Sequence, residues 1–266
     1  MSSGIYKLRM SRIFYVNSRN RVTGVDGDFT YAIDLKSFDP THAVILQAYI
    51  PKSYYLIADG KNTFELEEGK DVATVTIDPG SYSRSAFKSQ LQTRLNQASP
   101  NGWAYNISNP TTSEAETGKF TFAVSGNGGT QPAFNVGEHL WEQLGFDRGT
   151  TNEFNADALT SKNVINLQSE QTLFIHSDLI QDGDAVLQEI YSSNSLNFSG
   201  ISFQNPAPDM YAKKISSSDS DIYRFYLTDE NTNPINLNGL NIVFTLLIYT
   251  PVNWRAAISN ILNRLQ

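Results

Sequence analysis

Alternation of hydrophobic and polar residues indicates that most of this chain forms β-strands. Phe29, Tyr31 and Ile33 alternate with polar residues, which is the period of a strand that packs one face on a core. Residues 43–50 are apolar in both phases and end at Pro51, so they predict a central strand covered on both faces. The other predicted strands are residues 63–67, 73–77, 103–107, 120–124, 164–167, 173–179, 186–191, 201–203, 222–227 and 242–249. Together these strands predict an all-β sandwich.

The last predicted strand, residues 242–249, is apolar in both phases. Only Thr245 interrupts the apolar run, and a polar turn with Pro234 and the pair Asn238-Gly239 precedes it. A strand in a sandwich needs only one face on the core. The pattern therefore predicts that the outward side chains of residues 242–249 are covered by something other than the opposing sheet, such as a helix or an adjacent subunit.

A helix is predicted for residues 84–97. Phe87, Leu91 and Leu95 recur at intervals of four, which places them on one helical face, and Ser83 is positioned to cap the first turn.

A second, shorter helix is predicted for residues 137–144. Gly145 would supply the left-handed conformation that ends it, and Phe146 would fold back onto the last turn. We expect both helices to cover an end of the sandwich.

The C-terminal tail, residues 253–266, predicts a third helix, with Asn253 as the N-cap. Its apolar residues fall at offsets typical of a single helical face. They are Trp254, Ala257, Ile258, Ile261, Leu262 and Leu265. Because an isolated helix of this length is marginal in water, the stripe must dock either on its own domain or on a neighbouring subunit.

The N-terminal residues 1–11 predict an arm. Tyr6, Leu8 and Met10 alternate in one phase, whereas Ile13 and Tyr15 alternate in the opposite one. A one-residue change of phase sends side chains to the other face, so the chain is expected to change direction near residue 11. No linker divides the remainder, which predicts a single domain over residues 12–252, followed by the tail at 253–266.

Charge is distributed unevenly along the chain. The net charge is −7, but the chain before Asp26 and after Pro251 carries seven basic residues and no acidic one, leaving 13 basic against 27 acidic residues between them. Basic ends on an acidic body indicate two sides that face different surroundings. There is no cysteine, no leader and no apolar run near the roughly 20 residues of a membrane helix, so we expect neither disulfides nor a membrane span.

The sequence offers no convincing catalytic or metal site. His176, Ser177 and Asp178 are consecutive, and successive strand residues point to opposite faces, so they cannot form a relay. His42 and His139 lack a partner at ligand spacing. The Asp-x-Asp triplets at 26–28, 182–184 and 219–221 are better explained as turns than as calcium ligands. We expect no enzymatic activity and no cofactor.

Motifs along residues 16–249 resemble the penton and minor capsid proteins of virophages and Polinton-type (adintovirus-like) DNA viruses. The first half carries VNSRNR, GDFTYAIDL, AVILQAYIPKSYYLI and VTIDPGSYSRSAFKSQLQTRLN. The second half carries LGF, FIHSDLI and YLTDENTNPINLNG followed by the last apolar strand.

This resemblance implies a single jelly roll, with two four-stranded antiparallel sheets, short covering helices and the amphipathic C-terminal helix. It also implies a homopentamer at the fivefold vertices of an icosahedral capsid, beside a double jelly-roll major capsid protein, in virions assembled inside the host cell. The basic ends would contact the genome or inner capsid proteins. Some relatives carry an inserted domain, for which the sequence shows no room beyond the loops at 109–118 and 145–161.

The predicted assembly contacts lie in the arm and the tail. They are Tyr6, Leu8, Met10, Trp254, Ile258, Ile261, Leu262 and Leu265. Three alternatives stay open: a minor capsid protein away from the vertices, a jelly-roll module that binds carbohydrate or a receptor, and a cupin-like enzyme, which would need a histidine cluster.

Overall fold

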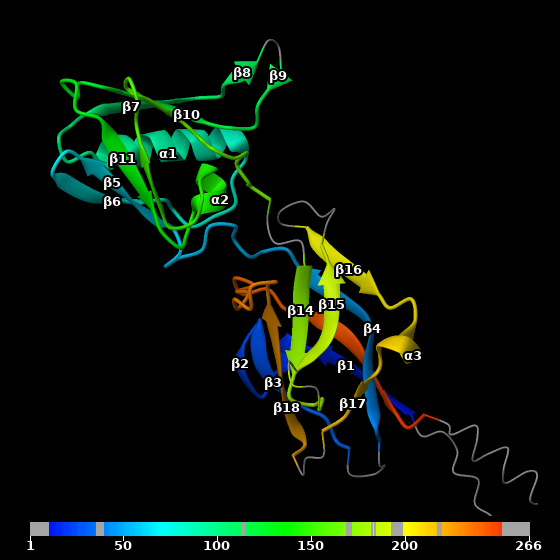
Figure 1. Ribbon diagram of the computed structural model, residues 1–266. Coiled ribbons are helices and arrows are strands. Elements are labelled where there is room, and N and C mark those ends of the chain that lie inside the picture. The colour runs from blue at the N-terminus through cyan, green and yellow to red at the C-terminus, as the bar shows by residue number, and fades with distance from the viewer. Residues whose placement is uncertain are drawn as a thin grey trace, which may run out of the picture. The chain divides into compact units, whose positions relative to one another are not determined.

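The chain divides into two compact units, shown in the computed structural model of Figure 1. The first unit combines the chain up to Tyr54 with the chain from Glu170 onward, and the inserted unit comprises Tyr55–Ser169. The described residues are 11–35, 40–112, 115–168, 172–181, 183, 185–192, 199–216 and 220–251. Where the sequence predicted one domain over residues 12–252, the structure has two units, each with its own hydrophobic core.

Sheet A of the first unit is antiparallel, with the strand order β1-β19-β4-β16. Its strands are β1 (Ser11–Asn17), β19 (Val243–Tyr249), β4 (His42–Pro51) and β16 (Gly200–Gln204). After β16 come the short helix α3 (Pro208–Tyr211) and the short strand β17 (Lys213–Lys214), which also pairs with β4. Since β4 lies between β19 and β16, the central position predicted for residues 43–50 is confirmed.

Sheet B of the first unit is also antiparallel, with the order β15-β14-β18-β3-β2. Its strands are β2 (Thr23–Val25), β3 (Asp28–Ala32), β14 (Thr172–Ser177), β15 (Val186–Tyr191) and β18 (Ile222–Thr228). A 3-10 turn, η1 (Ser18–Asn20), leads from β1 toward β2.

The connectivity of these two sheets is that of a jelly roll. When the eight longer strands of the first unit are counted in chain order, sheet A reads 1-8-3-6 and sheet B reads 2-7-4-5. Eight strands wound between two sheets in this way form two Greek keys. The two predicted four-stranded sheets are therefore present, each with one short extra strand, and the inserted unit lies in the chain between the third strand, β4, and the fourth, β14.

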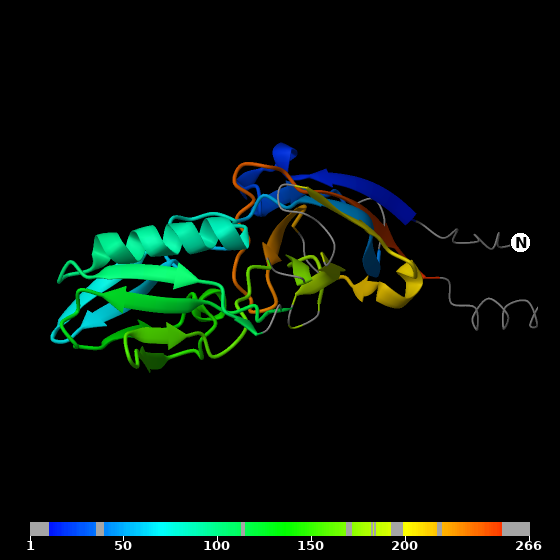
Figure 2. The same ribbon diagram turned by 90° about the horizontal axis from the view of Figure 1, so that it is seen from above.

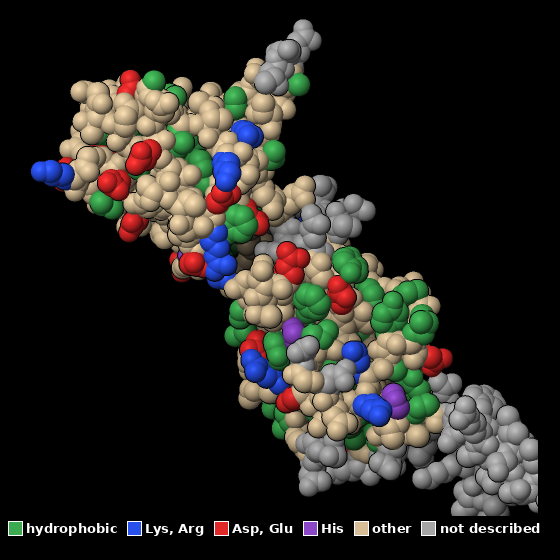
Figure 3. All heavy atoms as spheres, viewed as in Figure 1, with side chains coloured by type: hydrophobic (Ala, Val, Ile, Leu, Met, Phe, Trp, Pro, Cys, Tyr) green, Lys and Arg blue, Asp and Glu red, His purple; other side chains and the backbone are tan. Residues whose placement is uncertain are grey.

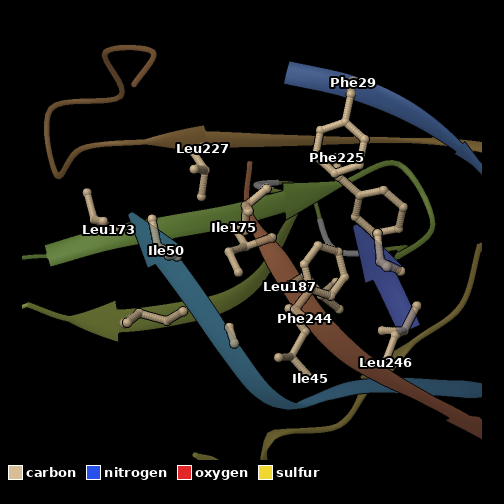
Figure 4. Close-up of a cluster of buried hydrophobic side chains, with 14 of the residues drawn as sticks. Phe29, Ile45, Ile50, Leu173, Ile175, Leu187, Phe225, Leu227, Phe244 and Leu246 are labelled. Atoms are coloured by element: carbon tan, nitrogen blue, oxygen red, sulfur yellow. The ribbon is translucent and has the colours of Figure 1, made fainter. Parts of the chain in front are cut away.

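The core of the first unit lies between sheets A and B (Figure 4). The ring of Phe225 in sheet B lies 5.9 Å from that of Phe29 on the neighbouring strand and 5.2 Å from that of Phe244 in sheet A. Ile45 and Leu246 complete the sheet A side of the same cluster. Because successive side chains point to opposite faces of a sheet, each strand also has side chains that point away from this core.

The inserted unit is built from two further antiparallel sheets and a helix. One sheet has the order β12-β11-β5-β6 and the other has the order β13-β10-β7. Their strands are β5 (Thr63–Glu68), β6 (Asp71–Thr76), β7 (Ala104–Ser108), β10 (Thr121–Ser125), β11 (Pro132–Val136), β12 (Thr150–Glu153) and β13 (Ala158–Thr160). The strands β8 (Thr111–Thr112) and β9 (Ala115–Glu116) pair with each other.

Helix α1 (Arg84–Ala98) confirms the predicted helix and lies along the strands of the inserted unit (Figure 2). The Ser83 hydroxyl accepts a hydrogen bond from the Ala86 amide at 3.3 Å, as expected of an N-cap. Phe87, Leu91 and Leu95 are fully buried in the core of this unit. The helix therefore covers the inserted unit's own strands, and not an end of the sandwich as predicted.

Helix α2 (Trp141–Leu144) is shorter than the predicted 137–144 but ends as predicted. Gly145 has φ of 74°, and the Phe146 amide donates to the Trp141 carbonyl at 2.9 Å. An added Cβ at Gly145 would lie 2.6 Å from the Asn163 carbonyl oxygen, so only glycine fits this stop. This helix too belongs to the inserted unit.

Other predictions need correction. Residues 164–167 form no strand, although Ile165 and Leu167 pack against the core of the inserted unit. The expectation that the chain has no room for an inserted domain is contradicted by the compact unit Tyr55–Ser169. β1 already begins at Ser11, the last residue of the predicted arm. The rest of the arm, residues 1–10, and the tail helix predicted for 253–266 lie outside the described residues.

Candidate assembly surface

The outer face of sheet A is formed by the side chains that point away from the core. Val16, Phe244 and Ile248 lie in the core, so the residues that alternate with them on β1 and β19 point outward. The outward residues are Ser11, Ile13, Tyr15 and Asn17 on β1, Val243, Thr245, Leu247 and Tyr249 on β19, His42, Val44, Gln47 and Tyr49 on β4, Gly200, Ser202 and Gln204 on β16, and Lys214 on β17.

Large hydrophobic side chains on this outer face are exposed. The exposed fraction is 72% for Tyr15, 51% for Ile13, 51% for Tyr49 and 39% for Val243. Leu247, which is paired with Ile13 across the strands, is half-buried. These residues lie on three adjacent strands, β1, β19 and β4. They form two apolar groups, Ile13 with Tyr15 and Leu247, and Val243 with Tyr49, and the polar pair Thr245 and Gln47 lies between them on β19 and β4.

The described outward residues of β1, β19, β4 and β16 include no Lys, Arg, Asp or Glu. Lys214 of β17, which pairs with His42, lies on the same face at the end where β4 begins. A sheet face that contacts only water normally carries polar and charged side chains, because these alternate along each strand with the apolar side chains of the core face. Depletion of charge together with exposed Tyr, Ile and Val is instead typical of the centre of a protein–protein interface. The composition of this face therefore indicates a binding surface.

One end of this outer face is already covered within the chain by α3. Tyr249 and Val44 are buried, and the Tyr249 hydroxyl donates to Asp209 of α3 at 3.4 Å. The ring of His42 lies 5.9 Å from that of Tyr249. The cover predicted for the last strand is thus present at its Tyr249 end, whereas Val243 at the other end is exposed. In the view of Figure 1, β14 and β15 of sheet B lie in front, and Figure 3 shows hydrophobic side chains on that side of the first unit as well.

Two contacts fix the middle of the outer face of sheet A. An added Cβ at Gly200 would lie 2.1 Å from the Tyr49 ring, so this ring rests directly on the backbone of β16. The Gln47 amide donates to the Thr245 hydroxyl at 3.4 Å and thereby satisfies two polar groups in the middle of the face. The exposed apolar surface is therefore positioned by its own sheet before any partner binds.

The outer face of sheet B differs in its chemistry. Arg224 donates two hydrogen bonds to the Asp28 carboxylate, at 2.7 and 2.6 Å, and these bonds raise the pKa of Arg224. The guanidinium also lies 4.6 Å from the centre of the Tyr226 ring, which stacks on His176. These charges and rings are paired with one another, as expected of a face exposed to water.

The described chain begins and ends at the same end of the strands of sheet A. Ser11, the first residue of β1, pairs with Tyr249, the last residue of β19. The predicted contact residues of the arm and the tail lie beyond these two positions, outside the described residues. The pairing of Ser11 with Tyr249 therefore places the end of the arm near the start of the tail. The side chains of the arm and the tail themselves are not described.

Sequence reasoning missed Tyr49 as a surface residue because it gave residues 43–50 two buried faces. Val243 is one of the outward side chains of residues 242–249 for which the sequence predicted an external cover. The exposed positions of β1 were signalled by the alternation of Ile13 and Tyr15 in the phase opposite to the arm. The pairing register that places the exposed residues of β1, β19 and β4 beside one another could be determined only from the structure.

The described residues bring no catalytic set together. His176 contacts the Thr228 hydroxyl at 2.9 Å, whereas Asp178 accepts from the Arg224 amide at 2.8 Å and Ser177 is buried. Asp26 and Asp28 accept hydrogen bonds from Gly239 and Arg224. Within the described part of the chain, no group of three or more His, Asp or Glu side chains could hold a metal ion.

No helix among the described residues is long and apolar enough to span a bilayer. No protein-family model matches the sequence, and no curated protein matches it. Among solved structures, the crystal structure of selenomethionine-labelled mavirus penton protein is similar to this chain, at 12% sequence identity and a TM-score of 0.48, over 89% of this chain and 99% of that one. The jelly-roll assignment above rests on the strand order of sheets A and B.

Proposed function

We propose that this protein is a penton-like capsid subunit that forms homopentamers at the fivefold vertices of an icosahedral shell. The observation that carries the proposal is the outer face of sheet A, where Ile13, Tyr15, Tyr49 and Val243 are exposed on strands of a jelly-roll unit. The described outward residues of β1, β19, β4 and β16 include no charged side chain. The sequence motifs that resemble penton and minor capsid proteins support it. The role is structural rather than enzymatic, and the place of action is the virion.

The arm and the tail supply further contacts in this proposal. Arm residues Tyr6, Leu8 and Met10 and tail residues Trp254, Ile258, Ile261, Leu262 and Leu265 would dock on neighbouring subunits or on a double jelly-roll major capsid protein. Burial of one large apolar side chain contributes about 1.5–3 kcal/mol. Several such side chains per contact offset the ordering costs of association. The basic residues of both ends would face the genome or inner capsid proteins.

Matched charge substitutions on the two sheets test this proposal. Ile13 on the outer face of sheet A and Ile222 on sheet B have similar exposed fractions, 51% and 47%. Ile13→Glu places an unpaired carboxylate in the proposed interface, which costs about 3–5 kcal/mol. We expect native mass spectrometry to show pentamers for the unsubstituted protein and for Ile222→Glu, and monomers for Ile13→Glu.

Two results would contradict the proposal at different levels. Pentamers that tolerate Ile13→Glu as well as Ile222→Glu would exclude the outer face of sheet A as the interface. An unsubstituted protein that stays monomeric at high concentration, alone and with a major capsid protein, would exclude the vertex role itself.

A further inference from the structure

We infer that the C-terminal tail, residues 252–266, of one copy packs on the outer face of sheet A of the next copy in the ring. The inference rests on the proposed function and names the two surfaces that would hold neighbouring subunits together. It follows from where the tail leaves the first unit, its length, its apolar stripe and the cover that α3 already provides.

The tail begins at one end of sheet A in its own copy. β19 ends at Tyr249, and the described chain continues only to Pro251. Tyr249 pairs with Ser11 on one side and with His42 on the other, so the tail starts from the middle of sheet A at one end of its strands. A segment that starts there can reach an adjacent molecule packed against the same end of the unit.

The dimensions of the tail fit those of the face. A helix from Asn253 to Gln266 would be about 20 Å long at 1.5 Å per residue. A seven-residue strand such as β1 or β19 is about 23 Å long. One tail helix is therefore long enough to span the part of the face that α3 leaves open, where Ile13, Tyr15 and Val243 lie.

The chemistry of the two surfaces also matches. The tail's stripe of Trp254, Ile258, Ile261, Leu262 and Leu265 has no charged member. The described outward residues of β1, β19, β4 and β16 include no Lys, Arg, Asp or Glu and expose Tyr and aliphatic side chains, whereas Lys214 of β17 lies at the end of the face beside His42. Each surface alone would leave apolar area in water, and together they bury it.

The contact is assigned to a neighbouring copy for two reasons. In the tail's own copy, α3 already covers the end of the outer face from which the tail starts. Tyr249 and Val44 are buried there, and the Tyr249 hydroxyl donates to Asp209 of α3. A closed ring also needs a heterologous interface, in which two different surfaces of the same chain meet. A tail on one side and a sheet face on the other are two such surfaces.

Disulfide trapping tests this contact cleanly because the chain has no cysteine. Full-length Tyr15→Cys and Ile261→Cys chains, carrying different affinity tags, are co-expressed, purified through both tags and oxidised. A disulfide forms only where the two Cα atoms approach within about 7 Å. We expect a covalent dimer that joins the two tags on a non-reducing gel.

Two matched controls define the geometry. Asn263→Cys replaces Ile261→Cys in the first control, because at 3.6 residues per turn position 263 lies about 200° around a helix from position 261. Ile222→Cys, on the outer face of sheet B, replaces Tyr15→Cys in the second. We expect the covalent dimer to be lost in both.

The outcomes separate this inference from the proposed function. Pentamers without the covalent dimer, or with equal amounts in the two controls, would overturn the inference and leave the vertex role standing. A doubly substituted Tyr15→Cys and Ile261→Cys chain that closes its disulfide within one molecule would overturn the assignment to a neighbour. Monomeric protein throughout would contradict both.

Discussion

The two units of this chain bury hydrophobic residues in different ways. The core of the first unit is mainly aliphatic and joins strands from two distant parts of the chain, before Tyr54 and after Glu170. The core of the inserted unit is rich in phenylalanine, comes from one continuous segment and includes a helix. One unit therefore needs both halves of the sequence to form, whereas the other can form from neighbouring residues.

This difference also separates their surfaces. The first unit leaves an apolar sheet face exposed, with Tyr15 and Ile13 at its edge. In the inserted unit, α1 lies over the strands, and its apolar residues Phe87, Leu91 and Leu95 are fully buried. In the inserted unit, an amphipathic helix of the same unit covers the strands. No described helix covers the outer face of sheet A in this way, except α3 at one end. The proposed assembly surface therefore lies on the first unit.

Truncation of one aromatic side chain in each core gives the largest expected effect on stability. Phe134 contacts four other phenylalanine rings, at 5.0 Å from Phe122, 5.2 Å from Phe154, 5.4 Å from Phe64 and 6.4 Å from Phe146. Phe134→Ala should lower the free energy of unfolding of the inserted unit by about 3–5 kcal/mol. The unfolding transition of the first unit should stay unchanged.

Phe225→Ala is the matched substitution in the first unit, where Phe225 packs between Phe29 and Phe244. Trp103 and Trp141 both lie in the inserted unit, so tryptophan fluorescence with Trp254 replaced by Phe follows that unit alone. Circular dichroism follows both units. A single transition that shifts equally in both variants would mean that the units unfold as one, against the separation described here.

Much of this architecture was predictable from the periodicity of the sequence. The strand at residues 43–50, the helix capped by Ser83 and the stop at Gly145 are local features, and each is found near its predicted place. The division into two units was not predicted. Residues 63–67 read as a strand whichever core they join, because a pattern of period two gives the inward face but does not identify the opposing sheet.

The candidate surface shows the same limit. The opposite phase of Ile13 and Tyr15 is visible in the sequence, but their position beside Val243 follows from antiparallel pairing across more than two hundred residues. The sequence also gave residues 43–50 two covered faces, whereas Tyr49 is half exposed. The contact of Tyr49 with Gly200 and the hydrogen bond from Tyr249 to Asp209 of α3 are tertiary contacts that the sequence pattern does not reveal.

A buried carboxylate in the inserted unit gives the next largest effect. The Glu68 carboxylate accepts hydrogen bonds from the Ser99 hydroxyl at 2.7 Å, the Tyr105 hydroxyl at 2.8 Å and the main-chain amide of Asn101 at 3.0 Å. Burial, together with the bond to Glu68, raises the pKa of Tyr105. Glu68→Ala leaves three donors without this acceptor, which should cost about 1–3 kcal/mol of stability.

Glu65→Ala, at an exposed position on the same strand, is the control and should change stability by less than about 0.5 kcal/mol. Denaturant unfolding followed by tryptophan fluorescence gives both values. Equal losses in the two variants would show that the Glu68 network does not hold α1 to the adjoining strands.

Acid should weaken the inserted unit by the smallest of these effects. Hydrogen bonds from Asn127 and Gln131 lower the pKa of Asp157 below its ordinary 3.8. A carboxyl whose pKa is lowered on folding contributes stability above the ordinary pKa and loses it as pH falls through the folded pKa. The unfolding midpoint followed by tryptophan fluorescence should therefore decline as pH falls below about 4, and Asp157→Asn should make that decline shallower.

Asparagine tolerates the left-handed conformation at this position, where φ is 62°. Asp59→Asn, at an exposed position of the same unit, is the control. An acid decline that is identical in both variants would show that the bonds from Asn127 and Gln131 to Asp157 add nothing to the stability of the inserted unit.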